Sequence, residues 1–212
     1  LKDIDQLVSK TILSPKKFAA VPAIKRYKEE TTPKNEVIIA PYDAKNIYMV
    51  QFHNDDQKWS ADRAPIIALF NEYFGGGMNA IVFQELRESR GLAYSASALY
   101  ASPYRLGGNE SFYTYIITQN DKMMDCVGEF NKLLNNVPVR QSGFDLAKQS
   151  LMKNLASQRT TKYSVLTAYL ALQRLGLDCS LSEKIYKALP SLQLQDVINF
   201  EKEYIANKPF KY

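Results

Sequence analysis

The order of the hydrophobic patterns constrains the fold of this 212-residue chain more than any other feature. Four segments have the short runs or period-two alternation of strands, namely 36–41, 46–53, 92–101 and 111–118. Two helical stripes separate the second segment from the third, and every pattern after residue 120 has helical spacing. Because strands and helices do not alternate strictly, a doubly wound parallel sheet is disfavoured. We expect an α+β fold, an antiparallel (αβ-roll-like) sheet covered on one face by helices.

Local signals add detail to this α+β expectation. The first two strand patterns are separated by turn residues and are expected to form a hairpin. Ser60 or Asp62 is a candidate cap for the first helix of the pair, and the second begins near Met78. Ser142 and Asp145 have the spacing of a capping box at the start of a later helix.

The amino-terminal segment differs in composition from the remainder. Residues 1–36 are polar and contain three prolines, and Ile4, Leu7 and Val8 have the spacing of one short helix. We expect residues 1–36 to be a linker or the tail of a preceding domain, and residues 37–212 to form one domain.

Composition excludes some classes of function. The net charge is +5, but the lysines and arginines are scattered and no basic, aromatic-interleaved motif occurs. We therefore expect no nucleic acid partner, and a basic anion-binding module is kept only as a minor alternative. No apolar run approaches the roughly 20 residues that cross a bilayer, so no membrane partner is expected. The compartment stays open between bacterial periplasm and cytoplasm.

Metal chemistry within this chain is disfavoured by its residue counts. His53 is the only histidine, and the two cysteines, Cys126 and Cys179, lie far apart. A zinc site in a protein normally takes several ligands from His, Cys, Asp and Glu at short spacings. We therefore expect no metal ligand in this chain and a structural role for His53.

Three consecutive glycines, Gly75, Gly76 and Gly77, interrupt the two helical stripes. A phosphate-binding loop of the Walker type needs a Lys and a Ser or Thr after the last glycine, whereas Met78 follows here. A dinucleotide fingerprint needs a preceding strand, and a helix is expected instead. The glycines therefore indicate either a helix–turn–helix corner or a loop that moves or closely approaches another surface.

Arg87 and Tyr94 are expected to lie near each other, because the helix that carries Arg87 must end and the next strand begin near Gly91. A guanidinium and a phenol can both donate hydrogen bonds to a carbonyl or a developing oxyanion. The alternative is that Arg87 pairs with Glu85 or Glu88 and that Tyr94 belongs to the core.

The segment GGGMNAIVFQELRESRGLAYS, residues 75–95, resembles the glycine-rich loop, helix and strand of the pitrilysin and insulin-degrading-enzyme (insulinase-type) zinc metallopeptidases. It is also similar to the mitochondrial processing peptidases. In that family an inverted H-x-x-E-H motif binds zinc in an amino-terminal half, and this chain has no such motif. The resemblance therefore implies a domain of the second, non-zinc half of a peptide hydrolase, inactive as a fragment.

The resemblance also implies roles and partners. Arg87 and Tyr94 match the arginine and tyrosine that contact the substrate near the scissile carbonyl, and Gly75–Gly77 match a loop beside the substrate. The implied partners are a peptide and a zinc-bearing half, in the same chain or another subunit. A family domain continues into a last strand beyond NKPFKY, so an exposed edge and self-association are expected. A non-catalytic scaffold domain of the same family is the alternative.

Overall fold

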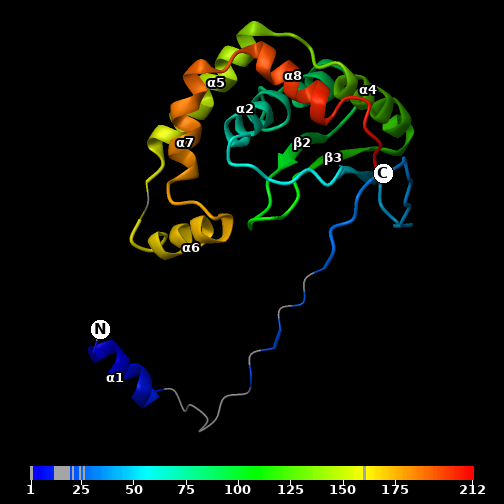
Figure 1. The fold of residues 1–212 in the computed structure, drawn as a ribbon. Coiled ribbons are helices and arrows are strands. Elements are labelled where there is room, and N and C mark those ends of the chain that lie inside the picture. Colours follow the sequence, from blue (N-terminus) through cyan, green and yellow to red (C-terminus); the bar gives the residue numbers. More distant parts are fainter. Residues whose placement is uncertain (1, 12–19, 21, 24, 26, 160) are drawn as a thin grey trace.

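One antiparallel sheet organises the fold in the computed structural model, which describes residues 2–11, 20, 22, 23, 25, 27–159 and 161–212 (Figure 1). Its strands are β1 (Asn46–His53), β2 (Ser95–Ala101) and β3 (Ser111–Gln119). The strand order is β1-β3-β2, and β3 pairs antiparallel with both neighbours. The predicted antiparallel pairing of the two strands within 92–118 is confirmed.

Helices account for most of the remaining described residues. They are α1 (Lys2–Thr11), α2 (Ala64–Phe74), α3 (Ile81–Phe83), α4 (Met123–Asn135), α5 (Gln141–Ser157), α6 (Val165–Leu175), α7 (Leu181–Ala188) and α8 (Leu194–Tyr204). The π-helix η1 (Gln84–Ser89) and the 3₁₀ turns η2 (Asn120–Lys122) and η3 (Leu189–Ser191) join them. Among the described residues, no helix combines the length and apolar character needed to cross a membrane.

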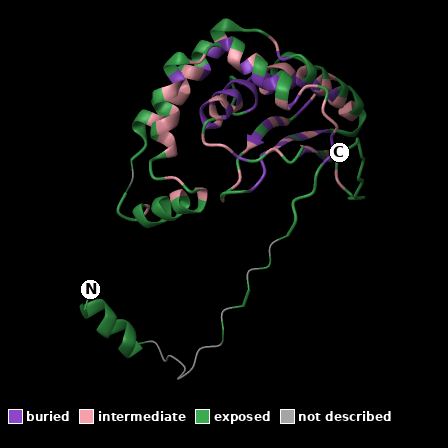
Figure 2. Cartoon of the chain, in the orientation of Figure 1, coloured by how far each residue is buried: buried purple, intermediate pink, exposed green. Residues whose placement is uncertain are grey.

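α2, α4 and α8 lie on one side of the sheet, and α5 packs against α2 (Figure 1). Met49, Gln51 and His53 of β1 are buried, whereas Tyr48 and Val50, which alternate with them, are exposed. β2 and β3 have the same alternation, and buried residues gather in α2 and the strands (Figure 2). Side chains alternate along a strand, so one sheet face belongs to the core and the other is open. The expected α+β class is confirmed.

α2 is the central helix of the core. Its Phe70 ring lies 5.1 Å from the ring of Phe74 and 5.2 Å from that of Phe200 in α8. Aromatic pairs at such distances contribute beyond their buried area. The helix begins after Arg63 without a side-chain cap, so the predicted cap at Ser60 or Asp62 is wrong. A proline in the first turn supplies the start instead.

The capping box predicted at Ser142 and Asp145 is also wrong. α5 begins at Gln141, and Gln141 Nε2 donates to Asp145 Oδ1 at 2.8 Å. The longer amide side chain reaches one turn along the helix and takes the carboxylate that the box would have used.

The predicted hairpin before β1 is wrong, because residues 36–41 form no strand. Tyr212 N–H donates to Glu36 O at 2.7 Å, and Lys211 and Phe52 exchange two backbone hydrogen bonds of 2.8 and 2.9 Å. The last residues of the sequence therefore lie between the 36–38 segment and β1. The apolar run was recognised correctly, but its partner is about 175 residues away along the sequence, as the separation of the Asn35–Phe210 hydrogen bond shows.

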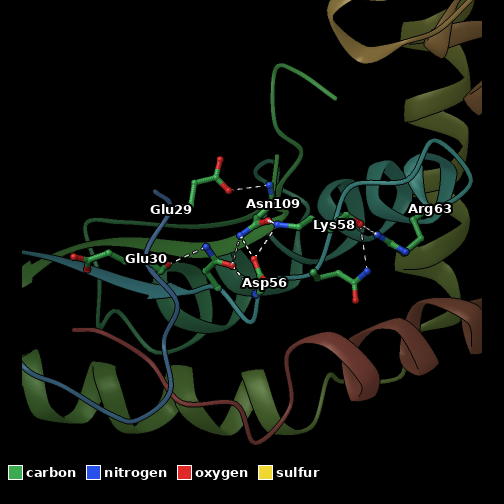
Figure 3. A network of polar contacts seen from close by, with 8 residues as sticks. Glu29, Glu30, Asp56, Lys58, Arg63 and Asn109 are labelled. Carbon is green, nitrogen blue, oxygen red and sulfur yellow. Dashed lines mark hydrogen bonds and ion pairs between the residues drawn. The ribbon is translucent and has the colours of Figure 1, made fainter. Parts of the chain in front are cut away.

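A polar network anchors the segment that precedes β1 (Figure 3). Asn109 N–H donates to Glu29 Oε2 at 2.9 Å, and Asn109 Nδ2 donates to Asp56 Oδ1 at 2.8 Å. Close by, Arg63 binds the buried carboxylate of Glu110 with two contacts of 3.1 Å. This bidentate pair joins the start of α2 to the β2–β3 connection, a geometry that adds specificity as well as energy.

Gly75 ends α2 against the backbone of β2. A Cβ atom at Gly75 would lie 2.1 Å from the carbonyl oxygen of Ala98, whereas a Cβ atom at Gly77 would meet nothing within 4 Å. Gly76 is also restricted, since its Cβ would lie 2.8 Å from Asn71 O. The first two glycines are therefore required by packing, and Gly77 is not.

We predict that Gly75→Ala lowers the free energy of unfolding by about 2 kcal/mol or more, because the added methyl group forces α2 and β2 apart. Gly77→Ala is the matched control and should change that free energy by less than about 0.5 kcal/mol. Urea denaturation of both variants provides the measurement. Equal stabilities would show that the close approach of α2 to β2 is not required.

Candidate functional site

Arg87 lies in the π-helix η1, which continues the short helix α3. Val82 and Leu86 are buried and hold this unit against the core, whereas the Arg87 side chain is 45% exposed. Met78 is 73% exposed and precedes α3, so the second helix begins later than the sequence predicts. π-Helical turns are rare and occur frequently at functional sites.

The chain returns from η1 to β2 through a tight turn. Gly91 has φ of 58°, a left-handed conformation that glycine adopts without steric cost. The carbonyl oxygen of Leu86 accepts hydrogen bonds from Leu92 N–H at 2.8 Å and Ala93 N–H at 3.2 Å. Tyr94 N–H then donates to Ile117 O of β3 at 2.8 Å. These bonds place Tyr94 directly beside the end of η1.

The structure brings Arg87 and Tyr94 together at the surface. The guanidinium carbon of Arg87 lies 5.7 Å from the centre of the Tyr94 ring and 4.8 Å from the centre of the Phe83 ring. Tyr94 is 73% exposed, which is inconsistent with the alternative that placed it in the core. A guanidinium stacked on rings keeps its N–H groups directed outward in its own plane, where a ligand can accept from them.

The glutamates near Arg87 have different partners. Glu88 lies 3.7 Å from Arg87 Nε, with both side chains about half exposed, so this ion pair is weak. Glu85 instead contacts Arg90 at 3.9 Å and also binds Arg140, which precedes α5. Its side chain is only 13% exposed. Arg87 is therefore left with one exposed, weakly held carboxylate that a ligand can displace.

The glycine loop divides into two parts. Gly75 and Gly76 are packed against neighbouring backbone, as described above. Gly77 is open and, with Met78 and Asn79, lines a cavity of about 370 Å³ whose other wall is α5. Of the three predicted loop residues, Gly77 alone has room for movement or for a ligand.

His53 is not placed to bind a metal. Its ring is buried, and Nδ1 lies 2.8 Å from Pro209 O, which accepts from it. Burial lowers the pKa of His53, favouring the neutral ring. In the ranges that the structure describes, no group of three or more His, Cys, Asp or Glu side chains is close enough to hold a metal ion.

The buried acid Glu201 of α8 was not singled out from the sequence. Burial raises the pKa of Glu201 to about 7, a value that suits a general base. Its side chain is 1% exposed, however, and it lies within the core. A substrate has no access to it, so it is not part of the candidate site.

Sequence reasoning missed three features of the site, which are the π-helical form of 84–89, the ring of Phe83 and the contact of Arg140 with Glu85. Phe83 could have been found, because an aromatic residue four positions before an arginine on a helix lies on the same face. Arg140 lies 55 residues from Glu85, and no local signal connects the two.

The family of the chain follows from a comparison with known families. The family profile described as the Peptidase M16 inactive domain matches residues 2–151, which is most of the chain. The chain therefore belongs to the M16 peptidase family and has the inactive-domain type. The resemblance to the pitrilysin and insulin-degrading-enzyme family that residues 75–95 indicated is confirmed.

Individual relatives agree with this membership. A Rickettsia bellii protein named as an uncharacterized zinc protease is 34% identical over 84 residues, which are 39% of this chain and 20% of that protein. The structure of a peptidase M16 inactive domain from Pseudomonas fluorescens has a TM-score of 0.69 at 19% identity, covering 90% of this chain and 45% of that one. For a protease from Helicobacter pylori the TM-score is 0.71 at 15% identity, with 99% and 51% covered. At these identities, the two structures show the fold alone, and this chain spans about half of each or less.

We predict that Tyr94→Phe changes the free energy of unfolding by less than about 0.5 kcal/mol, because the side chain is exposed. Tyr73→Phe is the contrasting variant, since Tyr73 OH donates to Pro138 O at 2.7 Å and accepts from Arg140 N–H at 3.0 Å. That variant should lose about 1–2 kcal/mol. Chemical denaturation of both measures this difference, and an equal loss would mean that Tyr94 serves the fold.

Proposed function

We propose that this chain is the substrate-contacting, non-zinc domain of a zinc metalloendopeptidase that hydrolyses peptides. The observation that carries the proposal is the exposed Arg87–Tyr94 pair, whose guanidinium carbon and ring centre are 5.7 Å apart. Membership of the M16 family and the name of the Rickettsia bellii relative, a zinc protease, support the class of reaction.

The chemistry of the pair suits a peptide carbonyl. Negative charge develops on the carbonyl oxygen when a nucleophile adds to the carbon, and donors already in place lower the barrier. The Arg87 guanidinium offers several N–H donors in one plane, and the Tyr94 phenol offers one O–H donor. The Phe83 ring, 4.8 Å from the guanidinium carbon, holds the first of these groups in place before the substrate arrives.

The described residues do not fit a zinc site, because the one histidine is buried and already bonded through Nδ1 to Pro209 O. The proposal therefore assigns zinc to another half of the enzyme, in the same chain or a partner subunit. Catalysis then requires the two halves to close on the peptide, and this chain alone is inactive. The loop that contains Gly77 is proposed to lie beside the bound peptide.

We predict that Arg87→Ala in the full-length protein lowers kcat by on the order of a hundredfold and that Tyr94→Phe lowers it by less. Each substitution removes a hydrogen-bond donor to the oxyanion. Peptide hydrolysis is measured with the zinc content and the unfolding transition of every variant. Arg105→Ala is the matched control, because Arg105 lies 5.4 Å from the ring of the exposed Tyr104 on the β2–β3 connection.

Two results would contradict this prediction. Wild-type turnover in both Arg87→Ala and Tyr94→Phe removes the pair from the mechanism. A full-length protein without zinc or hydrolytic activity in complex with its partners makes the domain a scaffold, the alternative within the same family.

The edge of β1 is a proposed site of self-association. The backbone N–H and C=O groups of Phe52 pair with Lys211 at the outer edge of β1. In an antiparallel pairing every second residue points to the same edge, so the backbone groups of Val50 and Tyr48 also point outward. Among the described residues, no strand pairs with them there. An unpaired strand edge of this kind offers backbone donors and acceptors to the same edge of a second copy. Tyr48 and Val50 are 58% and 47% exposed.

We predict that the 212-residue chain self-associates with rising concentration in sedimentation velocity, and that Val50→Lys weakens the association by placing a charge at the edge. Tyr115→Lys is the matched control, because Tyr115 lies on the same open face but in the central strand. A chain that stays monomeric throughout, or equal effects of both substitutions, would exclude edge pairing.

A further inference from the structure

Four charged side chains near Arg87 form a continuous network of ion pairs. Arg140, which precedes α5, binds Glu85 in η1, and Glu85 lies 3.9 Å from Arg90 at the end of η1. Arg90 continues to Glu129 of α4 with a contact of 3.3 Å. The π-helix is therefore connected by charge to two helices that are distant in sequence.

Glu85 is the residue of this ion-pair network that contacts two arginines. Its side chain is 13% exposed, whereas those of Arg90 and Arg140 are 48% and 45% exposed. Each of its two carboxylate oxygens contacts a different arginine. Glu85 is therefore held from two sides, and a carboxylate that contacts two arginines has less rotamer freedom than one in a single surface pair.

The constraint on Glu85 extends to Arg87 through the backbone of η1. Glu85 is two residues before Arg87 in the same π-helix, and its partner Arg140 is fixed by the hydrogen bond from its own N–H to Tyr73 OH at 3.0 Å. The start of α5 therefore sets the rotation of η1 about its axis. Without that reference, η1 could turn and carry the guanidinium away from Phe83 and Tyr94.

We propose that Glu85 is a positioning residue for Arg87. It acts through Arg140 and Arg90 to hold η1 in the rotation at which the guanidinium lies beside the rings of Phe83 and Tyr94. This inference rests on the proposed function, because it concerns the accuracy with which Arg87 meets the substrate carbonyl. Misplacement of a catalytic donor by about 1 Å can cost up to a hundredfold in rate.

A purely structural ion pair would behave differently from a positioning residue. Loss of a structural pair lowers stability, and its effect on turnover is independent of Arg87. Loss of a positioning residue lowers turnover only while Arg87 is present. Once Arg87 is replaced, Glu85 has nothing to position. A double-mutant cycle separates these two behaviours.

The experiment measures kcat and KM for peptide hydrolysis by the full-length protein with Glu85→Gln, Arg87→Ala and both substitutions. We expect Glu85→Gln to lower kcat by about tenfold with little change in KM. In the Arg87→Ala background, Glu85→Gln should have an effect of less than about twofold. The matched control is Glu183→Gln, which removes the carboxylate of an exposed ion pair with Lys187 in α7 and should leave turnover unchanged.

Arg140→Ala removes the other partner of the Glu85–Arg140 ion pair and serves as the second variant if Glu85→Gln does not fold. It should show the same dependence on Arg87. Effects of Glu85→Gln and Arg87→Ala that multiply would overturn the positioning role. If Arg87→Ala lowers turnover but neither Glu85→Gln nor Arg140→Ala does, the positioning role is overturned and the proposed function stands. If Arg87→Ala has wild-type turnover, the positioning role and the proposed function are both overturned.

Discussion

The contact between the end of α2 and the edge of β2 determines where the candidate site lies. The side chain of Asn71 accepts from Tyr100 N–H at 2.8 Å and donates to Tyr100 O at 2.9 Å, so it pairs with β2 much as a neighbouring strand would. One turn later, Gly75 lies against the backbone of Ala98. These contacts cover an edge that would otherwise invite pairing with another chain. They also fix the point from which the chain leaves α2, and hence the space in which α3 and η1 must fit.

The fold class could be predicted from the sequence because hydrophobic periodicity states which face of an element is buried. It does not state which element covers that face. Residues 36–41 show the difference, since their apolar run is real but Glu36 pairs with Tyr212 at the far end of the sequence. The predictions of helix caps were wrong for a related reason. At α2 a proline in the first turn replaces the expected cap, and at α5 Gln141 binds the carboxylate of Asp145.

The candidate site was predictable only in part. Arg87 and Tyr94 were identified because residues 75–95 resemble a known family and because the turn at Gly91 must bring them close. The π-helix was not predictable, since the residues of 84–89 have the composition of an ordinary α-helix. Its wider turn accompanies the pairing of Glu85 with Arg140, which is 55 residues away along the sequence and depends on the tertiary fold.

The residues that form the core of this domain differ from those of its candidate site. The core contains buried groups such as Phe70 and Leu86, whereas Arg87 and Tyr94 are exposed and lie outside it. The fold can therefore persist whether or not the pair acts on a substrate, and fold likeness alone does not separate a catalytic domain from a scaffold. The arrangement around Arg87 does bear on that choice. A scaffold surface gains little from an exposed arginine whose guanidinium carbon lies 4.8 Å from the centre of the Phe83 ring, because exposed charges contribute little to stability. Holding a donor in a fixed position is useful when charge develops nearby during a reaction, and this favours the substrate-contacting role.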